Sequence, residues 1–416
     1  MKRLLMIAYH FPPLAGSSGI QRTLRLVQQL PQFGWQPLVL TVRPEAYERC
    51  SDDMLADVPA GTVVKRSFAL DASRDLAIKG RYIGALARPD RWMSWRWFGV
   101  GDAMRLIREH KADAIWSTYP IASAHSIGAA VQARSGLPWV ADFRDPMAQP
   151  DYPPDPITRQ KFLDIEARIA AQAALMTFTT PSALRDYQGR YSAAASRMAL
   201  LENGYDEGSF AGAENQPRRA LNDDALTLLH SGIVYPWERD PTQLMAAMRL
   251  LLDRGVLQPG KPARNIKLRF RASVHDDLIQ RLAAEHGVSA HVETLPPVGY
   301  KDALAEMLNA DGLMLLQADN CNAQIPAKAY EYLRAGRPIF CLTDRAGDTA
   351  AVLRKAGVQS QFQLNEAEDI ARGLSLFLDE QARQRELCAD AAGVAQASRL
   401  ARTREFAAML DGLVKR

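Results

Sequence analysis

The chain has 416 residues, 47% of them hydrophobic and 24% charged, which is the composition of a globular protein and excludes a disordered one. Its length predicts two domains of about 200 residues each. The formal net charge of +4 is too small to indicate nucleic acid as a partner.

The cysteines are widely spaced and form no motif of the kind that binds metal; they are Cys50, Cys321, Cys341 and Cys388. We therefore expect free thiols in a reducing cytoplasm. The first apolar run, residues 3–9, is too short for a signal peptide and predicts a β-strand instead. No apolar run is long enough to predict a transmembrane span.

Short apolar runs alternate with helical stretches along the whole chain, which is the pattern of parallel sheets covered by helices. The predicted strands are 3–9, 37–42, 62–66, 113–118, 138–143, 174–180, 197–201, 226–231, 266–271, 291–295, 311–316 and 338–342. The apolar periodicity breaks between residues 203 and 226, so we predict one Rossmann-like domain over residues 1–205 and a second over residues 206–395. The last helical stretch, about 396–416, is expected to pack back on the first domain.

Ligands of such sheets bind beyond the carboxyl ends of the strands, so the loops at these ends receive most weight. The first loop contains Gly16, Ser17, Ser18 and Gly19 ahead of a helix. Small residues with exposed N–H groups can approach a phosphate or a sugar closely. An ordinary tight turn is the alternative, and the loop lacks the GxGxxG spacing of a dinucleotide site.

The second loop carries three charges, Asp142, Arg144 and Asp145, where a buried strand ends. Charges in this position are costly unless they are paired or used in chemistry. Both interpretations stay open: direct chemistry, or a structural pair of Asp142 with Arg144 or of Arg144 with Asp145.

The third loop contains Ser231 and Gly232 and reaches Arg239 just before a helix start marked by Asp240 and Pro241. Glycine lets a ligand approach the backbone closely. A guanidinium at this place could bind a diphosphate through paired hydrogen bonds. A surface contact between Arg239 and Asp240 is the alternative.

Residues 325–339 predict a charged helix followed by a buried strand, and Pro326 suits the first helical turn. Helical spacing places Gln324, Lys328 and Glu331 on one stripe, next to a helix N-terminus that favours an anion. This combination suits a nucleotide diphosphate. A surface helix with an ion pair is the alternative.

Residues 88–98 interleave arginine with tryptophan and phenylalanine. Such a mixture suits a membrane interface or an amphipathic acceptor. Packing of most of these aromatic side chains inside the first domain is the alternative, with one or two facing a groove.

Taken in order, these segments resemble those of family-4 glycosyltransferases, in the branch with an Asp-Phe-Arg-Asp-Pro run. The matching segments are His10-Phe11-Pro12-Pro13 with Gly16–Gly19, Asp142–Pro146, Asn203–Asp206, Ser231–Arg239 and Ile325–Lys328 with Glu331. The resemblance implies an α/β protein of GT-B architecture, with two Rossmann-like parallel-sheet domains facing across a cleft.

The resemblance also implies a retaining, metal-independent glycosyltransferase of the hexosyltransferase type, without a cofactor. The C-terminal domain would bind a nucleotide diphosphate sugar of the UDP or GDP type, and the N-terminal domain a saccharide or lipid-linked acceptor. The enzyme would act in the biosynthesis of a cell-surface polysaccharide or glycolipid. It would work at the inner face of the membrane.

Carried over residue by residue, Arg239 and Lys328 would bind the diphosphate and Glu331 the ribose hydroxyls, while the loop of residues 16–19 would close on the donor. The chain departs from the family pattern at Ala323, where a second glutamate is usual, and at Ile233, where a second cation is common. Arg144 also stands where a histidine is frequent. Two alternatives therefore stay open: a nucleotide-sugar epimerase of GT-B fold, and a catalytically silent GT-B subunit that serves in binding or scaffolding.

Overall fold

A computed structural model describes residues 1–17, 19–215, 217 and 219–414 of the chain. The chain divides into two compact units, one made of Met1–Glu202 with Arg402–Arg416 and the other of Asn203–Ala401. Ser18, predicted as part of the first loop, lies outside the described residues.

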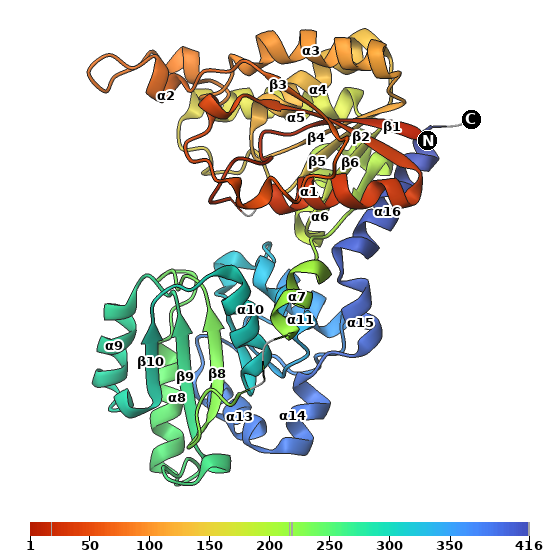
Figure 1. Ribbon diagram of the computed structural model, residues 1–416. Coiled ribbons are helices and arrows are strands. Elements are labelled where there is room, and N and C mark those ends of the chain that lie inside the picture. The colour runs from red at the N-terminus through yellow and green to blue at the C-terminus, as the bar shows by residue number, and fades with distance from the viewer. Residues whose placement is uncertain (18, 216, 218, 415–416) are drawn as a thin grey trace. The chain divides into compact units, whose positions relative to one another are not determined.

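The first unit is built on a parallel sheet that has seven strands in the described part of the chain (Figure 1). In chain order they are β1 (Lys2–Ile7), β2 (Trp35–Val42), β3 (Val63–Ser67), β4 (Ala114–Thr118), β5 (Trp139–Phe143), β6 (Leu175–Phe178) and β7 (Met198–Leu200). The spatial order is β3-β2-β1-β4-β5-β6-β7, which reverses direction between β1 and β4. The helices are α1 (Gly19–Gln29), α2 (Ala72–Asp75), α3 (Trp95–His110), α4 (Ala122–Ser135), α5 (Pro156–Gln172), α6 (Pro181–Arg190) and α16 (Arg399–Leu413).

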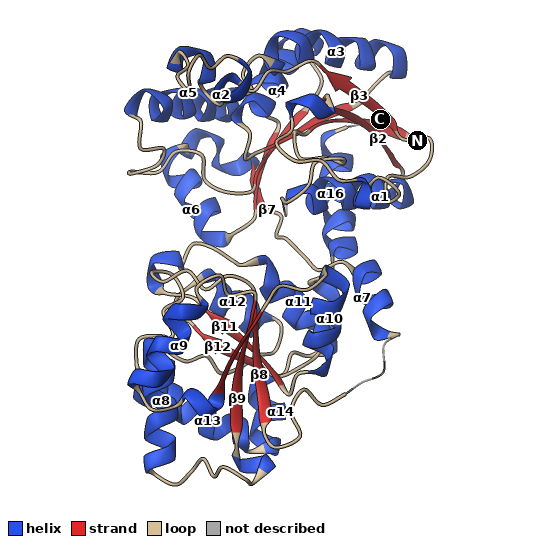
Figure 2. Ribbon diagram, turned by 60° about the vertical axis from the view of Figure 1, so that its left-hand side comes forward, coloured by secondary structure: helices blue, strands red, loops and turns tan. Residues whose placement is uncertain are grey.

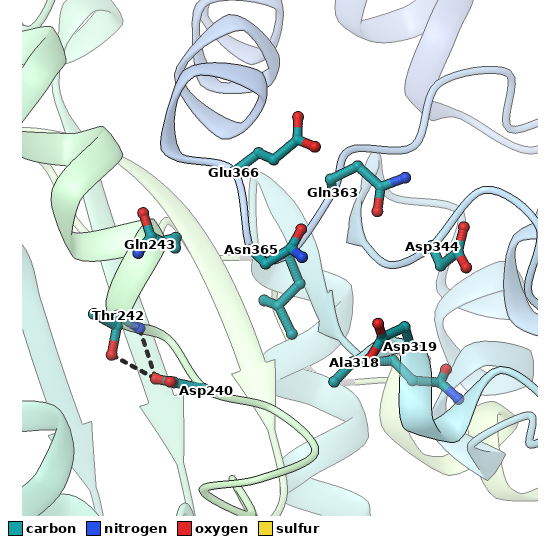
Figure 3. Close-up of a pocket in the computed structure, with 11 residues that line it drawn as sticks. Asp240, Thr242, Gln243, Ala318, Asp319, Asp344, Gln363, Asn365 and Glu366 are labelled. Atoms are coloured by element: carbon teal, nitrogen blue, oxygen red, sulfur yellow. Dashed lines mark hydrogen bonds between the residues drawn. The ribbon is translucent and has the colours of Figure 1, made fainter.

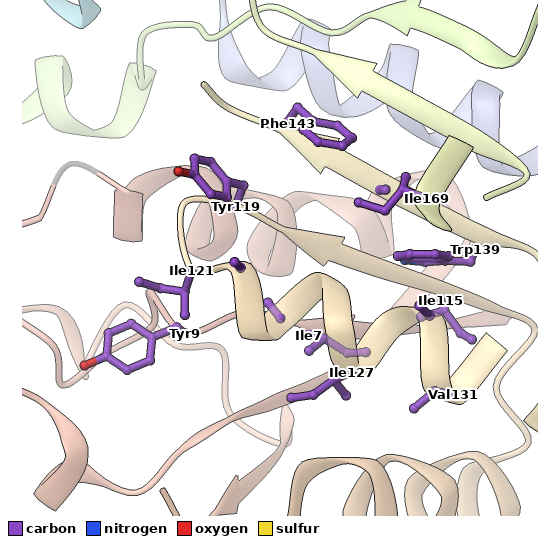
Figure 4. Packing of buried hydrophobic residues seen from close by; sticks show 14 of the residues in the cluster. Ile7, Tyr9, Ile115, Tyr119, Ile121, Ile127, Val131, Trp139, Phe143 and Ile169 are labelled. Atoms are coloured by element: carbon purple, nitrogen blue, oxygen red, sulfur yellow. The ribbon is translucent and has the colours of Figure 1, made fainter. Parts of the chain in front are cut away.

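Both faces of this sheet are buried, as a parallel sheet requires. Successive residues of β1 alternate between two apolar clusters: Leu5 and Ile7 join the cluster formed with α3 and α4, while Leu4 and Met6 join the cluster on the other face. Figure 4 shows the first cluster, in which side chains of the strands pack against α4. Phe406 and Leu410 of α16 are fully buried in the second cluster.

The second unit contains a parallel sheet of five strands within the described residues, with helices on both faces (Figure 2). The strands are β8 (Leu226–Ser231), β9 (Ile266–Arg271), β10 (Val292–Leu295), β11 (Gly312–Leu316) and β12 (Ile339–Leu342). Their spatial order is β10-β9-β8-β11-β12, with the reversal between β8 and β11. The helices are α7 (Glu207–Glu214), α8 (Thr242–Asp253), α9 (Asp276–Glu285), α10 (Tyr300–Asn309), α11 (Ala327–Ala335), α12 (Asp348–Lys355), α13 (Ala367–Leu378), α14 (Glu380–Leu387) and α15 (Ala391–Gln396).

Each predicted strand is present, with ends that differ by at most two residues. The predicted α/β class with two parallel sheets is therefore confirmed. Among the described residues, no helix is long and apolar enough to cross a membrane.

Candidate functional site

The reversal point of the second sheet places the loop after β8 beside α11. Gly232 has φ +110°, a conformation that favours glycine, and a Cβ on it would lie 3.1 Å from Lys328 Nζ, so the loop passes close to the lysine. The backbone N–H of Ser231 donates to the Tyr332 hydroxyl at 3.0 Å, and that of Gly232 donates to the Arg271 carbonyl at 2.8 Å. The loop is thus held against the helix that carries Lys328.

Lys328 contacts a buried histidine at the end of β8. Its Nζ lies 3.1 Å from Nε2 of His230, whose Nδ1 lies 3.0 Å from the Met314 carbonyl. A carbonyl oxygen only accepts, so Nδ1 carries the proton and Nε2 accepts a hydrogen bond from the lysine. Burial and the charge of Lys328 hold the pKa of His230 well below its usual value, which keeps the ring neutral.

Lys328 and Arg239 form a pair of cations. Burial, followed by the nearby Arg239, lowers the pKa of Lys328 to about 7. Arg239 donates to the Ile233 carbonyl at 2.5 Å and lies 5.0 Å from the centre of the Tyr235 ring. Within the described part of the chain, neither cation has a carboxylate within ion-pair distance, although the charge of Glu331 acts from further away to raise the pKa of Lys328. An anion bound here would relieve the repulsion between them.

The predicted contact between Arg239 and Asp240 does not form. The Asp240 carboxylate instead accepts hydrogen bonds from the N–H of Thr242, at 2.9 Å, and from its hydroxyl. These bonds support the start of α8 and leave the guanidinium of Arg239 uncompensated.

Glu331 lies one turn after Lys328 on α11 and accepts a hydrogen bond from the Tyr300 hydroxyl at 2.8 Å. Burial raises the pKa of this carboxyl group, while Tyr300 acts in the opposite direction. Lys328 and Glu331 attract each other only at a distance, and each makes its hydrogen bond with another residue, His230 and Tyr300 respectively.

The prediction that Gln324 shares the helical stripe is wrong. Helix α11 begins at Ala327, and Pro326 is its N-cap rather than part of its first turn. Gln324 precedes the helix, and its carbonyl accepts hydrogen bonds from Gln317 at 3.0 Å and Thr349 at 2.9 Å. The residue therefore fixes the path of the chain into α11.

A pocket of about 460 Å³ lies at the carboxyl ends of β11 and β12 and beside the start of α8 (Figure 3). Its lining is rich in carboxylates and amides and contains neither lysine nor arginine: Asp240, Thr242, Gln243, Gln317, Ala318, Asp319, Asp344, Gln363, Leu364, Asn365 and Glu366. Such a lining suits hydroxyl groups and disfavours phosphate. This pocket was not predicted from the sequence. Asp319 and Asp344 follow predicted strands, so the rule that ligands bind beyond the carboxyl ends of strands could have indicated it.

In the first unit, Asp142 is fully buried and binds Arg22 of α1, a residue to which the sequence analysis assigned no role. Arg22 donates to both carboxylate oxygens, at 3.0 and 2.7 Å, and the hydroxyls of Thr118 and Thr177 each donate at 2.8 Å. Burial acts to raise the pKa of Asp142, but these partners outweigh it and hold the pKa below its usual value. The predicted pairing of Asp142 with Arg144 is wrong, and the carboxylate is positioned to fix α1 rather than to meet a substrate.

Arg144 lies against the N-terminus of α1. Its guanidinium is 3.3 Å from Nδ1 of His10, and a Cβ on Gly19 would lie within 2.3 Å of both side chains. Among the described residues, the buried Nε of Arg144 has no hydrogen-bond partner. Burial, followed by the charge of Arg144, lowers the pKa of His10 to about 4, so this imidazole is neutral.

The other predicted site residues of the first unit, Gly16, Ser17 and Asp145, lie near Arg144 and the N-terminus of α1. Ser17 accepts a hydrogen bond from the N–H of Gly19 at 3.2 Å, and Gly16 has φ +80°. Asp145 is exposed, and its charge acts to raise the pKa of Arg144 against the larger effect of burial. The first unit thus gathers a glycine-rich turn, a helix N-terminus and a cation at the reversal point of its sheet.

The segment 88–98 is divided between core and surface. Trp92 and Trp95 are buried in the main cluster of the first unit, whereas Trp97 and Phe98 are 60% and 47% exposed. Packing therefore explains half of the aromatic side chains. Among the described residues, no group of three or more histidine, cysteine, aspartate or glutamate side chains could hold a metal ion.

The chain was compared with family models, with curated protein sequences and with solved structures. Residues 18–204 match the family model of the glycosyl transferase 4-like domain. No curated protein sequence matches the chain.

Several solved structures are similar over nearly the whole chain. Sucrose-phosphate synthase from Thermosynechococcus elongatus matches with a TM-score of 0.62 and 14% identity, over 99% of each chain. HepE from Anabaena, solved in complex with UDP and glucose, matches with 0.60 and 12%, over 99% of each chain. A putative UDP-N-acetylglucosamine 2-epimerase from Listeria monocytogenes matches with 0.57 and 12%, over 99% of this chain and 96% of the other. These likenesses confirm the GT-B fold.

Proposed function

We propose that this chain, which resembles family-4 glycosyltransferases and has the GT-B fold, transfers a sugar from a nucleotide diphosphate sugar to a saccharide or lipid-linked acceptor. The pair of cations Lys328 and Arg239, at the reversal point of the second sheet, carries the proposal. Two basic side chains that have no ion pair with a carboxylate among the described residues would bind an anion, and a diphosphate provides two negative groups.

The donor would be held by the second unit. Lys328 and Arg239 would bind the diphosphate, and Gly232 allows the phosphate to approach the backbone. Glu331, one turn further along α11, accepts a hydrogen bond from Tyr300 at one carboxylate oxygen, and its carboxylate would accept hydrogen bonds from the ribose hydroxyls. A UDP or GDP donor is the class we propose.

The acceptor would be held by the first unit, within a pathway for cell-surface polysaccharide or glycolipid. Gly16, Ser17 and Gly19 form the turn ahead of α1 beside the cation Arg144, and the resemblance assigns this turn to binding of the donor. Asp142 acts through Arg22 as a positioning residue for the helix that follows this turn.

The reaction we propose retains the anomeric configuration and needs no divalent metal. In an oxocarbenium-like transition state the leaving diphosphate gains negative charge. Lys328 and Arg239 would stabilise that charge directly, as preorganised cations do in a partly dehydrated site. The departing phosphate oxygen would then accept the proton of the attacking hydroxyl. We also place the protein in the cytoplasm, where its unpaired cysteines would stay reduced.

A nucleotide-sugar epimerase is the second candidate, because the Listeria protein of similar fold is described as a UDP-N-acetylglucosamine 2-epimerase. It would use the same donor site and release an altered nucleotide sugar without any acceptor. Product analysis after incubation with the donor alone separates the two enzymes, and a silent scaffold would give no product in either assay.

The first test is a calorimetric panel of UDP, GDP, ADP and their sugar conjugates, with and without EDTA. We expect one nucleotide class to bind independently of metal, and Lys328→Met and Glu331→Gln to weaken its binding. Lys267→Met is the matched control, because Lys267 lies near the amino end of β9, whereas the proposed site lies at the carboxyl ends of the strands. Unchanged affinity in both site variants would refute the donor-site assignment.

A further inference from the structure

The segment between α2 and α3 forms a hairpin that the proposed chemistry does not use. The N–H of Ile78 donates to the Arg81 carbonyl at 2.8 Å, and the N–H of Arg81 donates back at 3.1 Å. Lys79 and Gly80 between them have φ of 50° and 74°, which is the pattern of a type I′ turn. In Figure 1 the segment that follows α2 extends away from the rest of its unit.

This hairpin exposes apolar side chains. Every residue from Ile78 to Leu86 is exposed. Ile78 and Ile83 are 79% and 68% exposed, and Tyr82 and Leu86 add further apolar surface. A single exposed apolar side chain is ordinary, but a contiguous group on a projecting turn indicates an interaction surface.

The charge of the same segment is entirely positive. Lys79 and Arg81 are exposed, and no acidic residue occurs from residue 76 to residue 89. Apolar side chains and a tyrosine interleaved with cations match the interface of a membrane that contains anionic lipid headgroups. A second copy of this chain fits less well, because symmetric pairing of two hairpins would bring Lys79 and Arg81 against their own counterparts.

We propose that residues 76–86 dock the protein on an anionic membrane, with Ile78 and Ile83 entering the interface and Lys79 and Arg81 contacting the headgroups. This docking surface lies ahead of the segment 88–98 that the sequence indicated, in which Trp92 and Trp95 are buried in the core while Trp97 and Phe98 are exposed. This inference deepens the proposed function and rests on it in one respect, since docking would give access to a lipid-linked acceptor.

The test is co-sedimentation of the full chain with vesicles of phosphatidylcholine alone and of phosphatidylcholine with about one third phosphatidylglycerol. We expect binding to the anionic vesicles that weakens with added salt. Lys79→Asn with Arg81→Gln should weaken it by roughly fivefold for each charge removed. Asparagine is chosen at position 79 because it tolerates a positive φ and preserves the turn. Ile78→Ser with Ile83→Ser should weaken binding by at least about tenfold.

Leu55→Ser is the matched control, because Leu55 is a 39% exposed apolar residue of the same unit outside the hairpin. Three results would each overturn the inference: no binding of the unaltered protein to either vesicle, equal binding of the hairpin variants, or a dimer of the unaltered protein that the isoleucine variant loses. Nucleotide binding is measured on the same samples in solution. Absence of nucleotide binding by the unaltered protein, with vesicle binding intact, would refute the donor assignment and leave membrane docking standing.

Discussion

The lowered pKa of Lys328 predicts that binding of a nucleotide sugar takes up a proton. Burial and Arg239 bring this pKa to about 7, whereas the ordinary value is 10.5. A diphosphate between the two cations favours the charged lysine and should return its pKa toward the ordinary value. UDP-glucose is the best probe if the UDP class binds, because its doubly esterified diphosphate does not itself titrate near neutral pH.

The size of the uptake follows from the fraction of uncharged Lys328 in the free protein. With a pKa of about 7, that fraction is about 0.1 at pH 6, 0.5 at pH 7 and 0.9 at pH 8. Binding should take up nearly these numbers of protons for each ligand. Affinity should therefore be about tenfold lower at pH 8 than at pH 6.

Calorimetry in two buffers of different ionisation enthalpy, neither of them phosphate, measures the uptake directly. Lys328→Met should bind more weakly at every pH and should lose the uptake, whereas Lys267→Met should keep both. Refutation would come from an uptake near zero at pH 8 together with an affinity that does not change between pH 6 and pH 8.

The same structure makes three further predictions. Gly232→Ala and Gly255→Ala should both lower the melting temperature, because both glycines have positive φ. Only Gly232→Ala should weaken nucleotide binding, since its added Cβ would lie against Lys328, whereas that of Gly255→Ala would have nothing within 4 Å. Equal affinities of the two variants would contradict this. Asp142→Asn should lower the free energy of unfolding by about 3–5 kcal/mol, because it leaves the buried guanidinium of Arg22 without its carboxylate. Urea titration followed by fluorescence measures this change, since six of the seven tryptophans lie in the first unit. A loss below about 1 kcal/mol would count against the structural role of the Asp142–Arg22 pair. The pKa of His10, measured by NMR, should rise above about 4 in Arg144→Met yet stay below the ordinary 6.5 because burial persists; an unchanged value would exclude an effect of the Arg144 charge.

The strands could be predicted from the sequence because each is a short apolar run between polar segments. Residues 226–231 were predicted with the bounds that β8 has, since its buried core ends at a serine followed by glycine. Strand ends also indicated which loops meet at one edge of each sheet, which brought Gly232 and Lys328 into one hypothesis.

Partners of the charged groups could not be predicted in this way. Asp142 pairs with Arg22 across 120 positions of sequence, and Lys328 contacts His230 across 98. Local spacing suggested near neighbours instead, because it carries no information on which helix packs over a strand end. Gln324 shows the same limit, since hydrogen bonds from Gln317 and Thr349 hold it outside the helix that its spacing suggested.

The place of α16 has a consequence for biosynthesis. Phe406 and Leu410 complete the core of a unit whose other residues end at Glu202, so the ribosome must make all of the second unit before the first can close its core. The second unit is continuous in sequence and can fold as soon as it emerges. We therefore expect a chain truncated near residue 400 to aggregate through its N-terminal half, because the cluster of Leu4 and Met6 would keep α1 but lose Phe406 and Leu410.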